Sequence, residues 1–365
     1  MDNKLTDARR IINEVDREMA ELFARRMEAA KLVAEYKKER GLPVLDPARE
    51  EEVILKNSAY LEGKPEAVKS AYVKFLRETM AISRHYQHRL MEGMRVAYSG
   101  TEGAFACIAA GKIFPTAEKV AFGNFQDAYA SVVSGECDAA VLPLENSSAG
   151  EVGQVADLLF SGPLYVNETF DLAVKHDLLL VPGGKIEDVT TVVSHPQALG
   201  QCMPYIRRHG WKEKEYENTA LAAQYVAKKG DVSVAAIASA EAAELYGLTV
   251  AAEGVNETAN NTTRFAVLSQ VRNKAPEKRG NDMRFMLMFT VRNEAGSLAK
   301  AIDIIGCYGF NMNSLRSRPM KELLWEYYFC VEAEGNIDSA DGTDMLRALS
   351  ACCDRLKVIG SYSKK

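Results

Sequence analysis

Hydrophobic positions in the first part of the chain follow a helical period. From Leu5 to Arg40 there is neither Pro nor Gly, and apolar residues recur three, four or seven positions apart, as they do on one face of a helix. The pattern predicts one long helix. At 1.5 Å per residue it would be about 50 Å long, longer than a small domain is wide. We therefore expect its apolar stripe to pack against a second copy of the chain.

Two shorter helical patterns follow. Asp46 as N-cap and Pro47 at the first helical position start a second helix. A third runs over about 66–91. We therefore predict that segment 1–92 is entirely helical.

From Arg95 the pattern changes to short apolar strands that alternate with helical segments, which is typical of an α/β domain. The predicted strands are 96–98, 139–144, 178–181, 189–193, 234–237 and 265–268. The charged segment 272–282 lacks periodicity and is predicted to be a linker.

The last part of the chain has the order βαββαβ, which is the ferredoxin-like arrangement. Its predicted strands are 285–291, 311–316, 325–332 and 358–362, and its predicted helices are 297–307 and 342–353. The chain is thus expected to contain three domains, an all-helical one at 1–92, an α/β one at 95–271 and an α+β one at 281–365.

Composition narrows the classes of function. The 365 residues are 47% hydrophobic, as in globular proteins, and carry a net charge of −5. A basic field for nucleic acid or anionic lipid is therefore not expected, and no apolar run is long enough to span a membrane. The seven cysteines lack CxxC spacing and the five histidines do not pair at metal spacing. We expect a cytoplasmic protein with reduced thiols, no metal, no cofactor, and neither a nucleic-acid nor a membrane partner.

Polar residues interrupt the apolar faces of the helical segment. Steps of three or four residues from apolar positions lead to Arg9, Arg26 and Lys37 on the first helix. A single such cation usually extends to water. Several on one face favour a pocket for a small anion, such as a dicarboxylate, because unpaired buried charge is costly. The polar positions on the other two helices are Arg49, Glu50, Ser83 and Gln87.

At these positions the segment resembles the all-helical class of chorismate mutases, from Leu5 to about Met91. The resemblance implies an intertwined helical dimer, with Arg9 reaching into the partner's site, and a unimolecular rearrangement of chorismate to prephenate. The residues at the family's spacing are Arg9, Arg26, Lys37, Asp46, Arg49, Glu50, Ser83 and Gln87. Asp46 is either a substrate contact or only the cap of the second helix.

This rearrangement needs neither a base nor a nucleophile, so catalysis must come from ordering and electrostatics. Arginines would hold the two carboxylates of chorismate and fold its flexible arm over the ring. Lys37 and Gln87 would donate hydrogen bonds to the ether oxygen, on which negative charge grows as its carbon bond breaks. Glu50 would hold the ring hydroxyl.

Small hydroxyl and amide side chains lie near the predicted strand ends of the α/β region. The region contains neither a full GxGxxG nor a GxxxxGK[ST] motif, so nothing indicates a dinucleotide or P-loop site. Each group alone would usually be a turn or a cap. Together they could form a carboxylate-binding cleft that uses helix N-termini. The groups are Ser99–Gly103, Glu145–Ser148, Ser194–Gln197 and Asn261–Phe265.

As a set, the PLENS, SHPQAL and NxTRF motifs resemble the prephenate dehydratase family, from about Arg95 to Gln270. The resemblance implies two α/β lobes, as in a periplasmic binding protein, with an active site between them that converts prephenate to phenylpyruvate, water and carbon dioxide. Thr263 is then the catalytic residue, and we expect its hydroxyl to donate a hydrogen bond to the departing oxygen. The substrate-binding candidates are Asn146, Ser147, Ser194, His195, Asn261 and Arg264.

Three roles in this region stay open. Side chains alternate along a strand, so Arg264 should point away from Thr263 and could form a structural ion pair instead of holding a carboxylate. His195 is either a turn residue or an acid. The run Ala104–Cys107 lacks the hydroxyl residues that many family members carry there.

Two motifs near the C-terminus, NEAGSL at 293–298 and LRSRP at 315–319, resemble those of ACT regulatory domains. The resemblance implies a phenylalanine site between two such domains. Ser297 stands where an alanine is usual, and Arg316 stands where a glutamate is expected. The implied effector contacts are Ala295, Gly296, Ser297, Leu298, Ser317, Arg318 and Pro319.

The whole sequence thus predicts a bifunctional enzyme, a homodimer or larger, that makes phenylpyruvate from chorismate and is inhibited by L-phenylalanine. Two alternatives remain open. The second activity could prefer arogenate, or the α/β lobes could bind an amino acid without reacting.

Overall fold

The computed structural model describes residues 2–256, 260–274, 283–320 and 326–363. The chain forms two compact units, Met1–Met94 and Arg95–Lys365.

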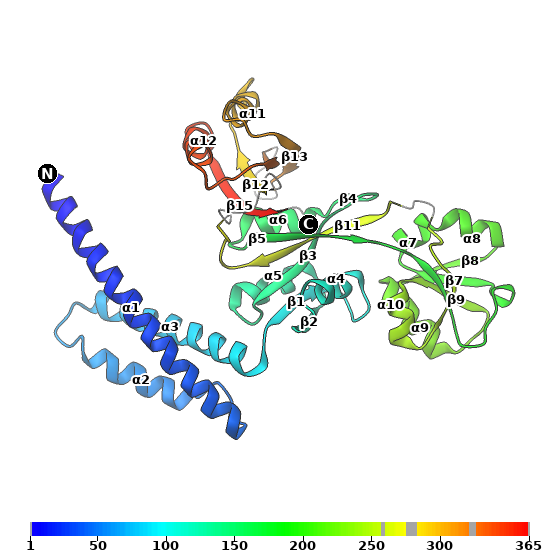
Figure 1. The fold of residues 1–365 in the computed structure, drawn as a ribbon, viewed down its shortest axis with the longest axis horizontal. Coiled ribbons are helices and arrows are strands. Elements are labelled where there is room, and N and C mark those ends of the chain that lie inside the picture. Colours follow the sequence, from blue (N-terminus) through cyan, green and yellow to red (C-terminus); the bar gives the residue numbers. More distant parts are fainter. Residues whose placement is uncertain (1, 257–259, 275–282, 321–325, 364–365) are drawn as a thin grey trace. The chain divides into compact units, whose positions relative to one another are not determined.

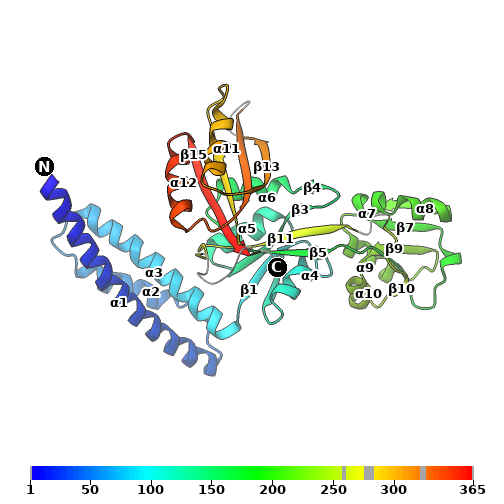
Figure 2. The same ribbon diagram turned by 45° about the horizontal axis from the view of Figure 1, so that its top comes forward.

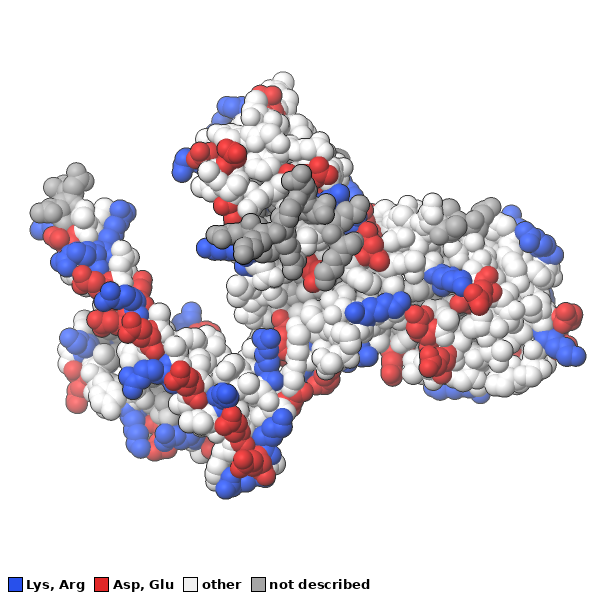
Figure 3. All heavy atoms as spheres, viewed as in Figure 1, with Lys and Arg blue, Asp and Glu red and all other residues white. Residues whose placement is uncertain are grey.

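The first unit is entirely helical, as predicted (Figure 1). Its helices are α1 (Asp2–Arg40), α2 (Pro47–Ala59) and α3 (Glu66–Glu92). Pro47 opens α2, and the side chain of Asp46 caps it by accepting a hydrogen bond from the Arg49 amide at 3.1 Å. Apolar residues of α1 stay exposed in the single chain, with Ile12 at 56% and Leu22 at 59%. Acidic and basic side chains are interspersed along α1 on the face seen in Figure 3, so its polar side carries no single-sign charge.

Two sheets form the α/β part of the second unit. One has the order β10-β6-β9-β7-β8, and the other, with 10 strands, has the order β13-β14-β12-β15-β5-β11-β3-β1-β2, with β4 paired to β3. The chain passes from one sheet to the other between β5 and β6 and returns between β10 and β11. The paired strands β5 and β11 run toward both lobes in Figures 1 and 2. The two-lobed arrangement expected for this part is therefore present.

The elements of the α/β part have the following bounds. Its strands are β1 (Arg95–Ser99), β2 (Glu118–Phe122), β3 (Ala139–Asn146), β4 (Gly150–Glu151), β5 (Tyr165–Ala173), β6 (Asp177–Leu180), β7 (Thr191–Ser194), β8 (Lys212–Glu215), β9 (Val234–Ala238), β10 (Thr249–Ala252) and β11 (Thr262–Ser269). Its helices are α4 (Phe105–Ile113), α5 (Phe125–Ser134), α6 (Gly153–Ser161), η1 (Ile186–Asp188), α7 (Pro196–Gln201), α8 (Met203–His209), α9 (Thr219–Lys229) and α10 (Ala240–Tyr246).

The C-terminal module has the predicted βαββαβ order. Its elements are β12 (Met283–Thr290), α11 (Ser297–Cys307), β13 (Met312–Pro319), β14 (Tyr327–Glu334), α12 (Ala340–Ser350) and β15 (Arg355–Ser363). Of the predicted linker 272–282, residues 275–282 lie outside the described residues. The module continues the sheet of the first lobe, because β15 pairs with β5 where Gly360 faces Val166. A Cβ atom on Gly360 would collide with the Val166 carbonyl, so only glycine allows this approach.

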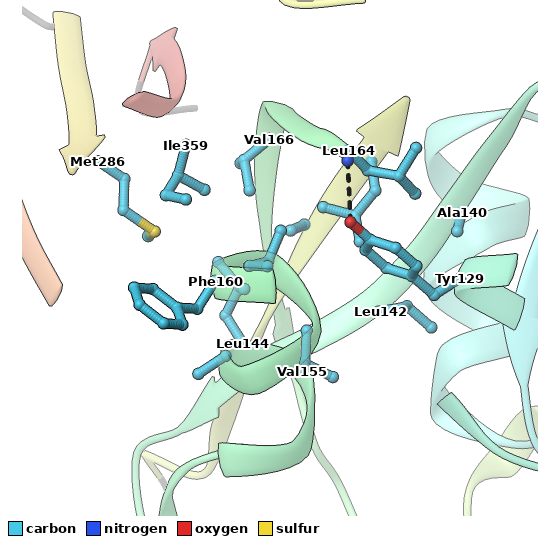
Figure 4. Close-up of a cluster of buried hydrophobic side chains, with 14 of the residues drawn as sticks. Tyr129, Ala140, Leu142, Leu144, Val155, Phe160, Leu164, Val166, Met286 and Ile359 are labelled. Atoms are coloured by element: carbon cyan, nitrogen blue, oxygen red, sulfur yellow. Dashed lines mark hydrogen bonds between the residues drawn. The ribbon is translucent and has the colours of Figure 1, made fainter. Parts of the chain in front are cut away.

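A shared hydrophobic core holds the module to the first lobe. Met286 of β12 and Ile359 of β15 pack in one buried cluster with residues of the lobe (Figure 4). In the same cluster, the rings of Phe160 and Tyr328 stack with their centroids 4.2 Å apart. Because such burial contributes about 25 cal/mol for each Å² of apolar surface, lobe and module stabilise one another.

Candidate active sites

A cavity of about 530 Å³ opens between the two lobes. It is lined by Ser99, Gly100, Phe105, Asn146, His176, His195, Gln197, Gln201, Asn218, Asn261 and Thr263, among others. Thr263 reaches it because β11 begins at Thr262, three residues earlier than the predicted strand at 265–268. The first residues of two helices line it as well, from α4 in the first lobe and α9 in the second. Their free backbone N–H groups favour anions.

A chain of hydrogen bonds crosses the cavity from lobe to lobe. The Asn146 amide nitrogen donates to the Thr263 hydroxyl oxygen at 2.9 Å and to the Asn261 Oδ1 at 2.8 Å. Asn261 in turn donates to the Gln201 Oε1 at 2.9 Å, and the His176 Nε2 lies 3.0 Å from the same oxygen. Burial lowers the pKa of His176. The network thus ties the Thr263 hydroxyl to a neutral imidazole on the other side of the cavity.

The backbone fixes which way the Asn146 amide points. Its Oδ1 accepts hydrogen bonds from the backbone N–H groups of Ser148 at 3.0 Å and Ala149 at 2.9 Å, so its nitrogen must face Thr263. Since the Thr263 oxygen accepts that bond, its own O–H hydrogen is left for a ligand in the cavity. This is the arrangement that a hydrogen-bond donor to a leaving oxygen requires.

Two of the predicted substrate contacts, Ser147 and Ser194, are not brought to the cavity. The Ser147 hydroxyl donates to the Asn260 carbonyl at 2.7 Å, and the fully buried Ser194 hydroxyl donates to the Ile237 carbonyl at 2.6 Å. Both hydroxyls donate to backbone carbonyls, and neither residue lines the cavity. His195 does line the cavity, and its Nδ1 accepts from the Gln197 amide at 3.2 Å as the cap of α7.

Arg264 does not line the cavity but lies in a cluster of ion pairs. Of the two roles left open for it, the structural ion pair is therefore the one observed. Its guanidinium lies 3.0 Å from Asp171, 3.4 Å from Glu332 of the C-terminal module and 3.7 Å from Glu145. Burial alone lowers the pKa of Arg264, but these ion pairs raise it overall. Arg316, which stands where a glutamate was expected, pairs with the same Glu145.

Two residues of the cavity, Gln201 and His176, were missed in the sequence. Gln201 lies one helical turn after Gln197 of the SHPQAL motif, and that spacing places both amides on one side of α7. His176 precedes the apolar strand β6 as the only ring in the run Val174–Asp177. The polar residues Lys175 and His176, which directly precede the buried strand β6, were the feature of the sequence that could have indicated this position.

The helical unit gathers part of its predicted polar set within one chain. The guanidinium of Arg26 donates to the Ser83 hydroxyl, and burial lowers the pKa of Arg26. The Lys37 ammonium donates to the Val44 carbonyl at 2.6 Å. Gln87 is 8% exposed, and its Oε1 has no hydrogen-bond partner among the described residues. These side chains come from α1 and α3, as the stripe pattern predicted.

The other polar residues of the helical unit lie differently. Glu50 pairs with Arg84, a residue the sequence did not suggest, and Arg49 pairs with Glu52 at 2.6 Å. Asp46 is the cap of α2. Arg9 is exposed, and no hydrogen bond or ion pair links it to the rest of the set within the described residues.

The first predicted effector motif forms the turn before α11 and its first two residues, and the second lies on β13. Gly296 caps α11 with φ of 86°, and Ala295, Ser297 and Leu298 adjoin it in the sequence. Arg318 of β13 lies 3.2 Å from Asp157 of the first lobe and donates to the Tyr328 hydroxyl at 3.0 Å. Ser317 and Pro319 flank Arg318 on the same strand.

Neither a metal-binding cluster nor a membrane-spanning helix is present in the part of the chain that the structure describes. Among the described residues, no group of three or more His, Cys, Asp or Glu side chains could hold a metal ion. The helices in the described ranges include none long and apolar enough to cross a membrane.

Comparison with known proteins assigns both units. The chorismate mutase type II family matches residues 8–88, and the prephenate dehydratase family matches residues 96–273. The bifunctional chorismate mutase/prephenate dehydratase of Neisseria gonorrhoeae is 32% identical over 99% of this chain and 98% of its own. Arogenate dehydratase/prephenate dehydratase 1 of Arabidopsis thaliana is 32% identical over 74% of this chain and 72% of its own.

A solved structure shares the fold of the second unit. The prephenate dehydratase of Arthrobacter aurescens, in complex with L-Phe, is 24% identical, with a TM-score of 0.68 over 74% of this chain and 90% of its own. Together with the full-length relative, these matches show that the chain belongs to the family of bifunctional chorismate mutase/prephenate dehydratases.

Proposed function

We propose that this enzyme makes phenylpyruvate from chorismate through prephenate, with Thr263 as the hydrogen-bond donor of the second step and L-phenylalanine as its inhibitor. The observation that carries the assignment of Thr263 is the bond from Asn146, because it leaves the threonine proton free in a cavity shaped between two lobes. The cavity wall includes no Lys or Arg among the described residues. Amides and helix N-termini would therefore hold the carboxylates of prephenate.

The dehydration needs one proton and one leaving group. As the ring carboxylate leaves as carbon dioxide, its bonding electrons enter the ring and expel the hydroxide, and the ring becomes aromatic. Thr263 first donates a hydrogen bond to that hydroxide and passes its proton to it late in the step, so that water leaves, and the threonine oxygen then takes up a proton from solvent. The Asn146 amide stabilises the negative charge that the threonine oxygen gains in this step.

The mutase site would be completed by a second chain. Apolar residues along α1 are exposed in the single chain, and burying them against a second chain would be favourable. Arg9 lies on the same exposed helix. An intertwined homodimer would bury this face and bring Arg9 to the other chain's Arg26, Lys37 and Gln87.

Regulation would reside in the C-terminal module, which we propose is an ACT domain at 281–365 following dehydratase lobes at 95–271 and a mutase at 1–92. Its motif residue Gly296 caps α11, Arg318 lies on β13, and a protein of the same fold was solved with L-Phe. We place the enzyme in the cytoplasm. Dehydratase rate measured against L-phenylalanine should fall cooperatively, and an unchanged rate at millimolar L-phenylalanine would contradict this role.

Product analysis after addition of chorismate tests the proposal. Accumulation of phenylpyruvate is the expected result. In a parallel assay prephenate and arogenate are compared as substrates at equal concentration. A higher kcat/KM for arogenate would identify the second activity as an arogenate dehydratase, and formation of neither product would leave an amino-acid-binding role for the lobes.

A further inference from the structure

His176 occupies a fixed position where the two lobes join. It lies in the segment that leads from β5 to β6, is 3% exposed, and packs edge-on against the ring of Phe105 with the centroids 5.7 Å apart. Its backbone N–H donates to the Asn256 Oδ1 at 3.1 Å, and its carbonyl accepts from the Val255 amide at 2.8 Å. The backbone of His176 is fixed by two hydrogen bonds and its ring by the contact with Phe105, so the position of the imidazole is well defined.

The hydrogen-bond chain determines which nitrogen of His176 carries the proton. The Asn146 nitrogen must donate, because its oxygen is occupied by two backbone amides. Asn261 therefore accepts with its oxygen and donates with its nitrogen, and Gln201 accepts with its oxygen. A donor must then face that oxygen from His176, so the proton is on Nε2.

The other ring nitrogen agrees with this tautomer. The Nδ1 of His176 is buried and has no hydrogen-bond partner among the described residues. A proton there would add a buried donor without an acceptor, which is unfavourable. The neutral ring with its proton on Nε2 is consequently the form that this environment favours.

We propose that His176 is a positioning residue of the dehydratase, whose Nε2 proton is the donor that holds Gln201, and through it Asn261, in the one orientation that fits the fixed Asn146 amide beside Thr263. The inference rests on Thr263 as the donor. If the group at this position accepted instead of donating, Gln201 and Asn261 would each have to reverse. Asn146 cannot reverse without leaving two backbone amides unpaired. The Asn261 and Asn146 nitrogens would then face each other as two donors, and their repulsion would displace the amide that bonds Thr263.

A matched pair of amide substitutions tests this role in the full chain. In His176→Gln the amide nitrogen can reach the position of Nε2, whereas in His176→Asn the shorter side chain places it near Nδ1. We expect His176→Gln to keep kcat for prephenate within about 3-fold and His176→Asn to lower it by about 30-fold or more, with KM within about 3-fold, because misplacing a reacting group by about 1 Å can cost about 100-fold. Retained kcat in His176→Asn, or an equal loss in both variants, would overturn the proposal.

A second variant keeps the test decisive if His176→Asn does not fold. Gln201→Met removes the acceptor of the Nε2 hydrogen bond, and His176→Phe keeps a ring but removes its donor, so each should lower kcat by itself, whereas adding His176→Phe to Gln201→Met should change kcat by less than about 3-fold further. If the loss of kcat in the double variant equals the product of the two single losses, His176 does not act through Gln201, and the proposal would fail. Thr263→Val is assayed in parallel, because its retained activity would refute the assignment of Thr263 separately. Mutase activity reports the amount of chain in each sample, and thermal unfolding of the second unit reports whether the variant folds.

Discussion

Replacement of Thr263 by valine isolates the hydroxyl on which the proposed dehydration depends. Valine keeps the shape of the side chain and removes both the donor and the acceptor. A positioned hydrogen-bond donor contributes about 100-fold to 10,000-fold to such a step, or about 3 to 5 kcal/mol of barrier. We therefore expect kcat for prephenate to fall at least about 100-fold with KM nearly unchanged.

The structure indicates that stability should suffer little from this change. Asn146 loses its bond to the threonine oxygen but still donates to the Asn261 Oδ1 at 2.8 Å and lies 3.3 Å from the Thr262 carbonyl. No buried donor is left unpaired, so the free energy of unfolding should fall by about 1 kcal/mol or less. A large loss of kcat can then be attributed to the reaction and not to unfolding.

The assay measures both activities in one sample, because mutase turnover of the same chain is an internal control. Thr263→Ser keeps the hydroxyl without the methyl group and should retain most of the dehydratase activity. Near-normal dehydration by Thr263→Val would refute the reasoning and make His195, which also lines the cavity, the next residue to test as the donor.

The other predictions concern separability and stability. Lys37→Ala should lower mutase kcat at least about 100-fold and leave dehydration within a few-fold; an equal loss of both activities would contradict two separate sites. Tyr129→Phe should lower the free energy of unfolding by about 1–3 kcal/mol, because the buried Leu164 amide donates to the Tyr129 hydroxyl at 2.8 Å (Figure 4). Gly360→Ala should cost about 3 kcal/mol through its collision with the Val166 carbonyl. Thermal unfolding of the full chain checks both, and an unchanged midpoint in either variant would show that the contact is not stabilising.

Local patterns in the sequence predicted many elements, but the strands β2, β4, β5, β8 and β10 were not predicted. The helical period of residues 5–40 corresponds to α1, and the βαββαβ order of the C-terminal module is confirmed. By contrast β8, with the sequence KEKE, is exposed at every position and forms a strand only because β7 pairs with it. Its existence depends on a neighbour that is distant in the sequence, which no local period reveals.

The candidate site was predicted only as far as its motifs extend. Asn146, Asn261 and Thr263 meet at the cavity, and their motifs pointed to them. Gln201 and His176 join them through hydrogen bonds between residues 25 and 60 positions apart. A buried histidine of this kind looks like an ordinary core residue until its partners are known.

The close approach of Gly360 to Val166 has a consequence for how the protein unfolds and how it can be divided. The strand pairing and the shared core make lobe and module one cooperative folding unit, so calorimetry should resolve a transition for this unit apart from that of the helical unit. A chain cut after Gln270 would bare the edge of β5 and the apolar groups that Met286 and Ile359 cover, and exposed edges of this kind promote aggregation. Point substitutions are therefore better suited than truncation for separating catalysis from its control in this enzyme.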